Sequence, residues 1–381
     1  MKIYIDNFDL DNRGNQLMIQ SVIDQIRSHY GNNAQIFVCE RVFIQNPSYC
    51  FTNKLYPLAA TNTGKRHMRL VKKLTNSLLG DNWIVTPNEI DVVLNCLGYC
   101  YSDHFITEVE EYWYYAKNYY AAFSKTDRKI ILLPQAFGPY ENEWSKKTML
   151  EVYEMVDKIF CRDSVSYNHL QNILPDINKI SVASDFTCLC KPTETPSVQL
   201  PEKQYVVLVP NFNMLRYIDK EIYLNYLQNI VECINLHSYQ VYLLNHEGEK
   251  DLEILQELNA RLKNQKPIIT NLSAFEYKSV IQHCRLLVSD RFHALVSGLT
   301  QGVPCLYAGW SYKYEELCKE HNCDCNKLDI HDLNATLHTI SDAITNPDKY
   351  KSKEGCEKIL ETNVLQMWKE VFDLLDSAIS R

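Results

Sequence analysis

Strand-like and helix-like segments alternate along this chain of 381 residues, and the alternation restarts half-way. Apolar runs such as 206–209 and 286–289 read as buried strands, and 220–237 reads as an amphipathic helix. A stretch with three prolines at 191–204 separates the two series, and such composition is typical of an interdomain linker. Because strands that alternate with helices form parallel sheets covered by helices, we expect an α/β chain of two Rossmann-like, doubly wound domains facing across a cleft.

The predicted domain limits follow from this pattern. We expect an N-terminal domain at 1–190, the linker at 191–204, a C-terminal domain at 205–345, and terminal helices at 346–381 that cross back. A hydrophobic content of 46% suffices for two cores. The net charge of −8 argues against a nucleic-acid partner, which calls for a basic face.

Cysteine usage and the first residues bear on the compartment. The fourteen cysteines lie mostly in apolar runs, where a free thiol behaves as a small hydrophobic group. The chain opens with a strand at 2–6 rather than the apolar run of a signal peptide, and it contains no uninterrupted apolar run of about 18 residues. We expect a reduced, cytoplasmic protein without a transmembrane helix.

The segment from Leu286 to Gly302 combines a buried strand, a polar turn and a helix. Its turn holds Arg291 and His293 at the carboxyl end of the strand, where open α/β sheets bind ligands and helix starts favour anions. A guanidinium matches a carboxylate or phosphate, and an imidazole exchanges a proton near neutral pH. The structural alternative is that Arg291 pairs with Asp290 or another acid and that His293 only begins the helix.

A second arginine occupies an equivalent place in the first half. Arg162 follows the strand 158–161 and precedes a helix, so it either binds an anion or pairs with Asp163 or a neighbour at the helix cap.

The most basic part of the chain is the predicted helix at 63–79, which includes Lys65, Arg69, Lys72 and Lys73. An ordinary surface helix packed on the first domain is one interpretation. The other is a helix on an anionic membrane surface, because basic residues that flank an apolar face attract such lipid.

One cysteine-rich cluster has ligand types that suit zinc, namely Cys318, His321, Cys323 and Cys325. Its spacing does not match the usual zinc motifs, and we therefore expect no metal here.

The run from Val288 to Leu295 resembles the signature of the polysaccharide pyruvyltransferase family, Ser-x-Arg-x-His-Ala before a Gly-x-Pro strand and a lysine. The matching residues here are Ser289, Arg291, His293, then Gly302-Val303-Pro304 and Lys313. Other segments resemble family landmarks: the turn 12–15, the turn Gln135–Pro139, Arg162 with Asp163, and His246 before Asp251. At Cys96-Leu97-Gly98 the chain departs from the family's Gly-Gly-Gly turn.

The resemblance implies a GT-B architecture and transfer of the pyruvyl group of phosphoenolpyruvate onto two hydroxyls of a sugar, forming a cyclic ketal. The acceptor would be a lipid-linked polysaccharide precursor, met at the inner face of the membrane by a peripherally attached protein. No metal or other cofactor is expected. The resemblance implies that the catalytic groups are His293 and Arg291. It implies that the donor is bound by Arg162, Arg291, His246 and Ser289. The implied acceptor-binding residues are Asn12, Gly14, Asn15 and Gln135.

The chemistry of these residues agrees with that reaction. Phosphoenolpyruvate carries a carboxylate and a phosphate, so its site needs cations or helix starts, and its enol carbon needs a general acid such as His293. Two alternatives stay open. A nucleotide-sugar glycosyltransferase would use Arg291 and His246 to bind a diphosphate, and a catalytically silent subunit of a capsule assembly complex would account for the altered glycine turn.

Overall fold

The computed structural model describes residues 1–6, 10, 12–59, 77, 80, 83–103, 120–123, 127–192, 195–201, 205–323 and 326–379. The chain forms two compact units. Unit 1 contains residues 1–10, 18–186 and 363–381, and unit 2 contains residues 11–17 and 187–362. Among the helices described, none combines the length and the apolar character needed to cross a membrane. The basic stretch 63–79 lies outside the described residues except for Ser77, so its predicted helix stays a prediction.

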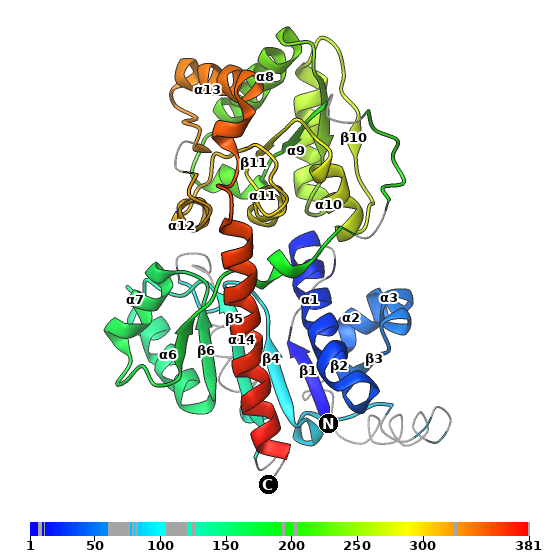
Figure 1. Cartoon of the computed structure of the whole chain (residues 1–381), viewed down its shortest axis with the longest axis vertical. Coiled ribbons are helices and arrows are strands. Elements are labelled where there is room, and N and C mark those ends of the chain that lie inside the picture. The colour runs from blue at the N-terminus through cyan, green and yellow to red at the C-terminus, as the bar shows by residue number, and fades with distance from the viewer. Residues whose placement is uncertain are drawn as a thin grey trace. The chain divides into compact units, whose positions relative to one another are not determined.

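Unit 1 is built on a seven-stranded parallel sheet with strand order β3-β2-β1-β4-β5-β6-β7 (Figure 1). Its strands are β1 (Lys2–Asp6), β2 (Gln35–Cys39), β3 (Leu55–Leu58), β4 (Val92–Asn95), β5 (Lys129–Gln135), β6 (Lys158–Cys161) and β7 (Ile180–Val182). The described helices are α1 (Arg13–Tyr30), α2 (Glu40–Gln45), α3 (Pro47–Thr52), α6 (Glu143–Met155) and α7 (Ser164–Ile173).

Unit 2 repeats the plan with a five-stranded parallel sheet of order β10-β9-β8-β11-β12. Its strands are β8 (Tyr205–Val209), β9 (Gln240–Leu244), β10 (Ile268–Ile269), β11 (Leu286–Ser289) and β12 (Cys305–Leu306). Its helices are α8 (Lys220–Leu236), α9 (Gly248–Arg261), α10 (Ala274–Gln282), α11 (Phe292–Leu299), α12 (Tyr312–Glu320) and α13 (Leu333–Thr345). Short 3-10 helices include η3 (Phe186–Leu189), η4 (Phe212–Arg216) and η6 (Pro347–Tyr350).

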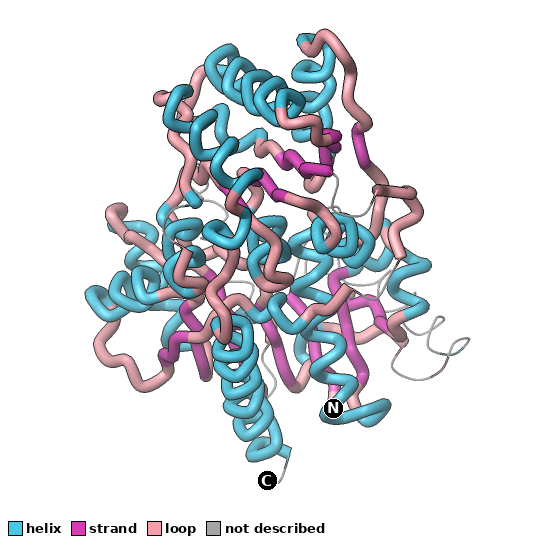
Figure 2. The backbone as a smooth tube through the Cα atoms, turned by 45° about the horizontal axis from the view of Figure 1, so that its top comes forward, coloured by secondary structure: helices cyan, strands magenta, loops and turns pink. Residues whose placement is uncertain are grey.

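Both faces of the unit 2 sheet are covered, because successive side chains of a strand point to opposite faces. Val206 and Leu208 of β8 belong to the apolar core that includes residues of α8, α9 and α13. Tyr205, Val207 and Val209 belong to the other core, with residues of α10, α11 and α12. Figure 2 shows the resulting arrangement, strands inside and helices outside. The predicted fold class of two Rossmann-like, doubly wound units is thus confirmed.

Two segments divide differently from a simple split at residue 190. Residues 11–17 belong to unit 2, although they connect β1 to the body of α1 in unit 1. The terminal helix α14 (Cys356–Ile379) begins in unit 2 and ends in unit 1. The first turn of α1 therefore contributes its side chains to the site of unit 2.

Candidate functional site

The candidate site lies in unit 2 at the point where its strand order reverses. Strands β8 and β11 are neighbours there. From β8 the chain continues to β9 on one side, and from β11 it continues to β12 on the other side. Ligands of open α/β sheets bind beyond the carboxyl ends of such strands. The residue pairs that follow are Pro210-Asn211 after β8 and Asp290-Arg291 after β11, so the arginine predicted from sequence sits at this switch point.

Ser289 shapes the turn between β11 and α11. Its hydroxyl donates to the carbonyl of Arg291 at 3.0 Å and accepts from the backbone N–H of Arg291 at 3.1 Å. The side chain is completely buried. The hydroxyl of Ser289 thus supports the turn that presents Arg291 and His293, and its predicted contact with the donor stays a prediction.

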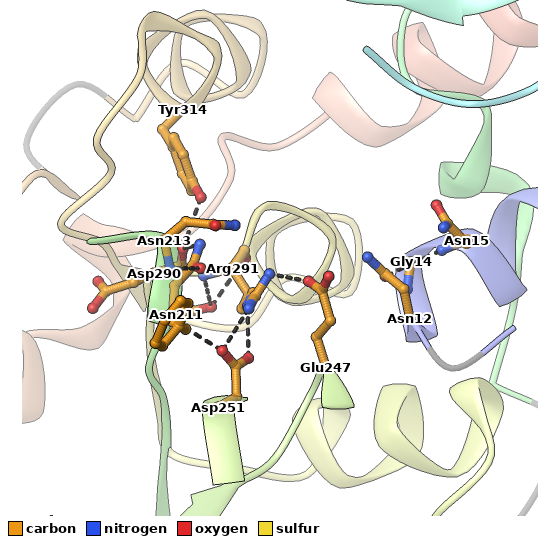
Figure 3. Close-up of polar contacts among 12 residues, drawn as sticks. Asn12, Gly14, Asn15, Asn211, Asn213, Glu247, Asp251, Asp290, Arg291 and Tyr314 are labelled. Atoms are coloured by element: carbon orange, nitrogen blue, oxygen red, sulfur yellow. Dashed lines mark hydrogen bonds and ion pairs between the residues drawn. The ribbon is translucent and has the colours of Figure 1, made fainter. Parts of the chain in front are cut away.

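Arg291 is held by two carboxylates (Figure 3). Its Nε donates to Asp251 Oδ2 at 2.7 Å, its Nη2 donates to Asp251 Oδ1 at 2.5 Å, and its Nη1 pairs with Glu247. Asp251 is fully buried in the first turn of α9, whereas the Glu247 side chain is 32% exposed. Arg291 therefore forms an ion pair, as the structural alternative expected, but not with its neighbour Asp290.

Asp290 instead ties the turn to the adjacent strands. Its carboxyl accepts from Tyr223 Oη at 2.6 Å and from the backbone N–H of Ala308 at 3.1 Å. Its backbone carbonyl accepts from Asn211 Nδ2 and from Tyr314 Oη. Burial raises the pKa of Asp290 to about 7. The residue beside Arg291 thus fixes the backbone that carries it, and does not neutralise it.

The first turn of α1 packs directly against His293. Asn12 Oδ1 caps the helix by accepting from the backbone N–H groups of Gly14 at 2.8 Å and Asn15 at 3.3 Å. Asn12 also forms an isolated antiparallel bridge with Glu247, the partner of Arg291. A Cβ atom on Gly14 would lie 2.1 Å from His293 Nδ1, so only glycine leaves room for this imidazole.

A second histidine lies deep in the same site. His246 follows β9 and is 3% exposed, and its ring lies 5.9 Å from that of Tyr277 between centroids. The guanidinium of Arg13 lies 5.7 Å above the Tyr277 ring. Burial, followed by the positive charges of Arg291, His293 and Arg13, holds the pKa of His246 well below its usual value. His246 is therefore neutral at physiological pH.

Lys313, which the family signature includes, is a further cation of this site. It is 9% exposed, and its Nζ lies 5.0 Å from the Trp310 ring and 5.5 Å from the rings of Phe292 and Tyr314. Since Phe292 directly precedes His293, the lysine is anchored beside the turn that carries the histidine.

Two of the predicted site residues, Arg162 and Gln135, belong to unit 1. Arg162 is 4% exposed and pairs with Asp185 at 3.6 Å, between Nη1 and Oδ2. The neighbour Asp163 caps α7 by accepting from the backbone N–H of Ser166 at 2.7 Å. The predicted ion pair with Asp163 is therefore wrong, because that carboxylate serves as a helix cap and Asp185 takes its place.

Gln135 lies at the end of β5 and is fully buried in unit 1. Its Nε2 donates to Asn95 Oδ1 at 3.0 Å, and its Oε1 accepts from Cys100 Sγ at 3.2 Å. Asn95 in turn donates to Asp6 at 2.8 Å, at the ends of the neighbouring strands β4 and β1. Gln135 thus anchors a buried network, and its predicted part in acceptor binding stays a prediction.

The cysteine cluster shows thiol packing in its described part. Cys323 Sγ donates to the carbonyl of Cys318 at 3.4 Å, and His321 Nδ1 hydrogen-bonds to Ser352 Oγ at 2.8 Å. Among the residues described, no group of three or more histidines, cysteines and acids could hold a metal ion, and Cys325 lies outside them.

The structure therefore brings together seven of the predicted residues in unit 2 and leaves two in unit 1. The seven are Asn12, Gly14, Asn15, His246, Ser289, Arg291 and His293, and the two are Arg162 and Gln135. Sequence reasoning did not assign Arg13 or Glu247 to the site. The signal for Arg13 was its place inside the polar turn after the first strand, but nothing in the pattern showed that this turn packs beside His293.

Comparison with known families decides the assignment. The family described as polysaccharide pyruvyl transferase matches residues 12–312, which include both the turn at Asn12 and the signature at Arg291 and His293. The chain belongs to this family. A comparison with curated proteins finds no match. The predicted membership, and with it assignment to a family of transferases, is confirmed.

Solved structures with the same fold are GT-B nucleotide-sugar enzymes. UDP-GlcNAc 2-epimerase from Neisseria meningitidis has a TM-score of 0.62 and 13% identity, over 98% of this chain and 100% of that one. HepE from Anabaena, in complex with UDP and glucose, has a TM-score of 0.62 and 11% identity, over 99% of this chain and 100% of that one. At such identities the likeness establishes the GT-B fold and nothing about the ligands of this chain.

Proposed function

We propose that this protein transfers the pyruvyl group of phosphoenolpyruvate to two hydroxyls of a sugar in a polysaccharide precursor, forming a cyclic ketal. The observation that carries the proposal is the position of His293, which rests against Gly14 and follows the turn that contains Arg291. A titratable group among cations at a switch point suits protonation of an anionic substrate.

The proposed reaction begins with proton transfer from His293 to the methylene carbon of phosphoenolpyruvate. A sugar hydroxyl then adds to the enol carbon, the bond from that carbon to the phosphate oxygen breaks, and a second hydroxyl closes the ketal. Of the two hydroxyl protons, one replaces the proton that His293 gave to the new methyl group, and the other leaves with inorganic phosphate. Cations that face the departing phosphate stabilise its charge, so the proposal includes no metal.

Arg291 can serve this reaction on one edge only. Asp251 occupies Nε and Nη2, whereas Nη1 pairs with the partly exposed Glu247. We assign the Nη1 edge to the donor carboxylate, which would share or replace Glu247 there. A guanidinium fixed by a buried acid loses little freedom when the ligand binds.

The acceptor in this proposal is a sugar on a membrane lipid, reached by peripheral attachment through the basic stretch 63–79. The support is the family's link to polysaccharide together with the sequence of that stretch, which falls outside the described residues. Asn12, Gly14 and Asn15 remain the proposed acceptor-side residues, and their place beside His293 and Glu247 would bring the hydroxyls to the donor.

The decisive experiment measures phosphate release from phosphoenolpyruvate with a lipid-linked glycan fraction as acceptor, for the parent and for His293→Gln. We expect the variant to lose roughly a hundredfold in turnover, while its affinity for phosphoenolpyruvate stays within a few fold. Binding assays with UDP-, GDP- and CMP-sugars run in parallel. If the parent protein binds a nucleotide sugar and does not bind phosphoenolpyruvate, the proposed reaction is wrong and a glycosyltransferase activity takes its place.

A further inference from the structure

One unexplained feature of unit 2 is a buried imidazole with a ring nitrogen that has no hydrogen-bond partner among the described residues. His246 is 3% exposed, and its Nδ1 has no partner among the described residues. Buried polar atoms in folded proteins are nearly always paired, and leaving one unpaired costs stability. His246 thus offers a nitrogen to a ligand that the protein alone does not supply.

Arg13 is a cation that is connected to this imidazole through the ring of Tyr277. Its guanidinium lies over the Tyr277 ring at 5.7 Å, and the same ring lies 5.9 Å from that of His246. Arg13 is also flanked by Asn12, which bridges to Glu247, and by Gly14, which contacts His293. The arginine therefore reaches the predicted donor site from the first turn of α1.

Arg291 is less suited to hold a phosphate dianion. Three of its N–H groups already point at Asp251 and Glu247, so its charge is shared with two carboxylates. A phosphate placed on the same guanidinium would meet the charge of these acids. The two anionic groups of the donor are better separated, with the carboxylate and the phosphate on different arginines.

We propose that Arg13 and His246 form the phosphate subsite of unit 2, with Tyr277 as the surface that positions both, and that its ligand is a phosphomonoester. Arg13 would bind two phosphate oxygens with its planar fork, and the neutral His246 would donate one N–H to a third. The positive end of the 18-residue helix α1 adds to the attraction. The identification of this phosphomonoester as phosphoenolpyruvate rests on the proposed function.

The arrangement also explains why Arg13 and Gly14 are adjacent. The phosphate would be held by one residue, and the imidazole of the general acid rests against the next. One helical turn thus sets the distance between the leaving group and the proton donor.

The test is calorimetric titration of the full-length protein with inorganic phosphate and, separately, with phosphoenolpyruvate. The variants are Arg13→Gln, Arg13→Lys and His246→Gln. The matched control is Arg261→Gln, since Arg261 pairs with Glu221 between α9 and α8. We expect Arg13→Gln to weaken both probes roughly 10- to 100-fold, Arg13→Lys to recover part of the loss, and the control to bind within twofold of the parent.

The outcomes separate the two proposals. If Arg13→Gln binds both probes as the parent does, the subsite is overturned and the proposed function stands. If the parent binds phosphate through Arg13 but does not bind phosphoenolpyruvate, the subsite stands and the proposed donor is wrong. A parent that binds neither probe overturns both. Should Arg13→Gln not fold, Arg13→Lys provides the comparison, because it keeps the charge and loses the fork.

Discussion

Replacing Gly14 with alanine tests the position of His293 directly. The added Cβ would lie 2.1 Å from Nδ1 and 2.6 Å from Cγ of the imidazole, whereas ordinary contacts begin near 3.4 Å. The ring must therefore move by about 1.3 Å, and a displacement of about 1 Å at a reacting group can lower turnover about a hundredfold. Stability should change little, because rotating one side chain costs about 1 kcal/mol and alanine in a helix regains up to about 1 kcal/mol.

The assay is a double-mutant cycle with His293→Ala, measured by phosphate release from phosphoenolpyruvate. If alanine at 14 acts by displacing the imidazole, Gly14→Ala should cost about a hundredfold in the parent and almost nothing in the His293→Ala background. Thermal unfolding of all four proteins separates misplacement from unfolding. Equal losses in both backgrounds would refute the reasoning, because Gly14 would then act independently of His293.

Three further outcomes are expected. Arg162→Ala should lower the unfolding free energy by about 3 kcal/mol in urea titrations, since Asp185 would be left buried without its cation; a loss below about 1 kcal/mol would contradict the buried pair. Burial lowers the pKa of His321 to about 4. As the pH falls below 6.5, this imidazole is therefore protonated in the unfolded chain before it is protonated in the folded one. The free energy of unfolding should thus fall by about 1.4 kcal/mol per pH unit from pH 6.5 towards 4. His321→Gln should flatten that slope in urea titrations at pH 6.5 and 5, and an unchanged slope would assign it to other groups. Lys72→Glu/Lys73→Glu should reduce sedimentation with anionic vesicles at low salt, and parent-like binding would remove the proposed membrane contact.

The sequence predicted the architecture because the relevant signals are local. Strand and helix periodicity repeats within each unit, and parallel sheets follow from the alternation itself. The switch from β11 to α11 could be located for the same reason, since the strand, the turn and the helix occupy one continuous stretch. The predicted position of Arg291 at the carboxyl end of a strand followed from this location of the strand and the helix.

The partners of Arg291 could not be predicted in this way. Asp251 lies 40 residues before it, in the first turn of α9, and Glu247 lies 44 residues before it, at the N-cap of the same helix. Periodicity shows which residues end a strand, but it does not show which acid reaches which arginine. Asp290 was the nearest acid in sequence, yet its carboxyl points to Tyr223 and the backbone of Ala308.

The turn at 12–14 combines three functions that depend on one backbone geometry. Asn12 caps the helix, Arg13 lies over Tyr277, and Gly14 leaves space for His293. Each residue contributes a different property: a side-chain acceptor, a planar cation and the absence of a Cβ. Since they are consecutive, no one of them can shift along the helix without displacing the others. An insertion in this turn, which appears in sequence as a short polar loop, would therefore separate the helix cap, the cation over Tyr277 and the space for the imidazole of His293.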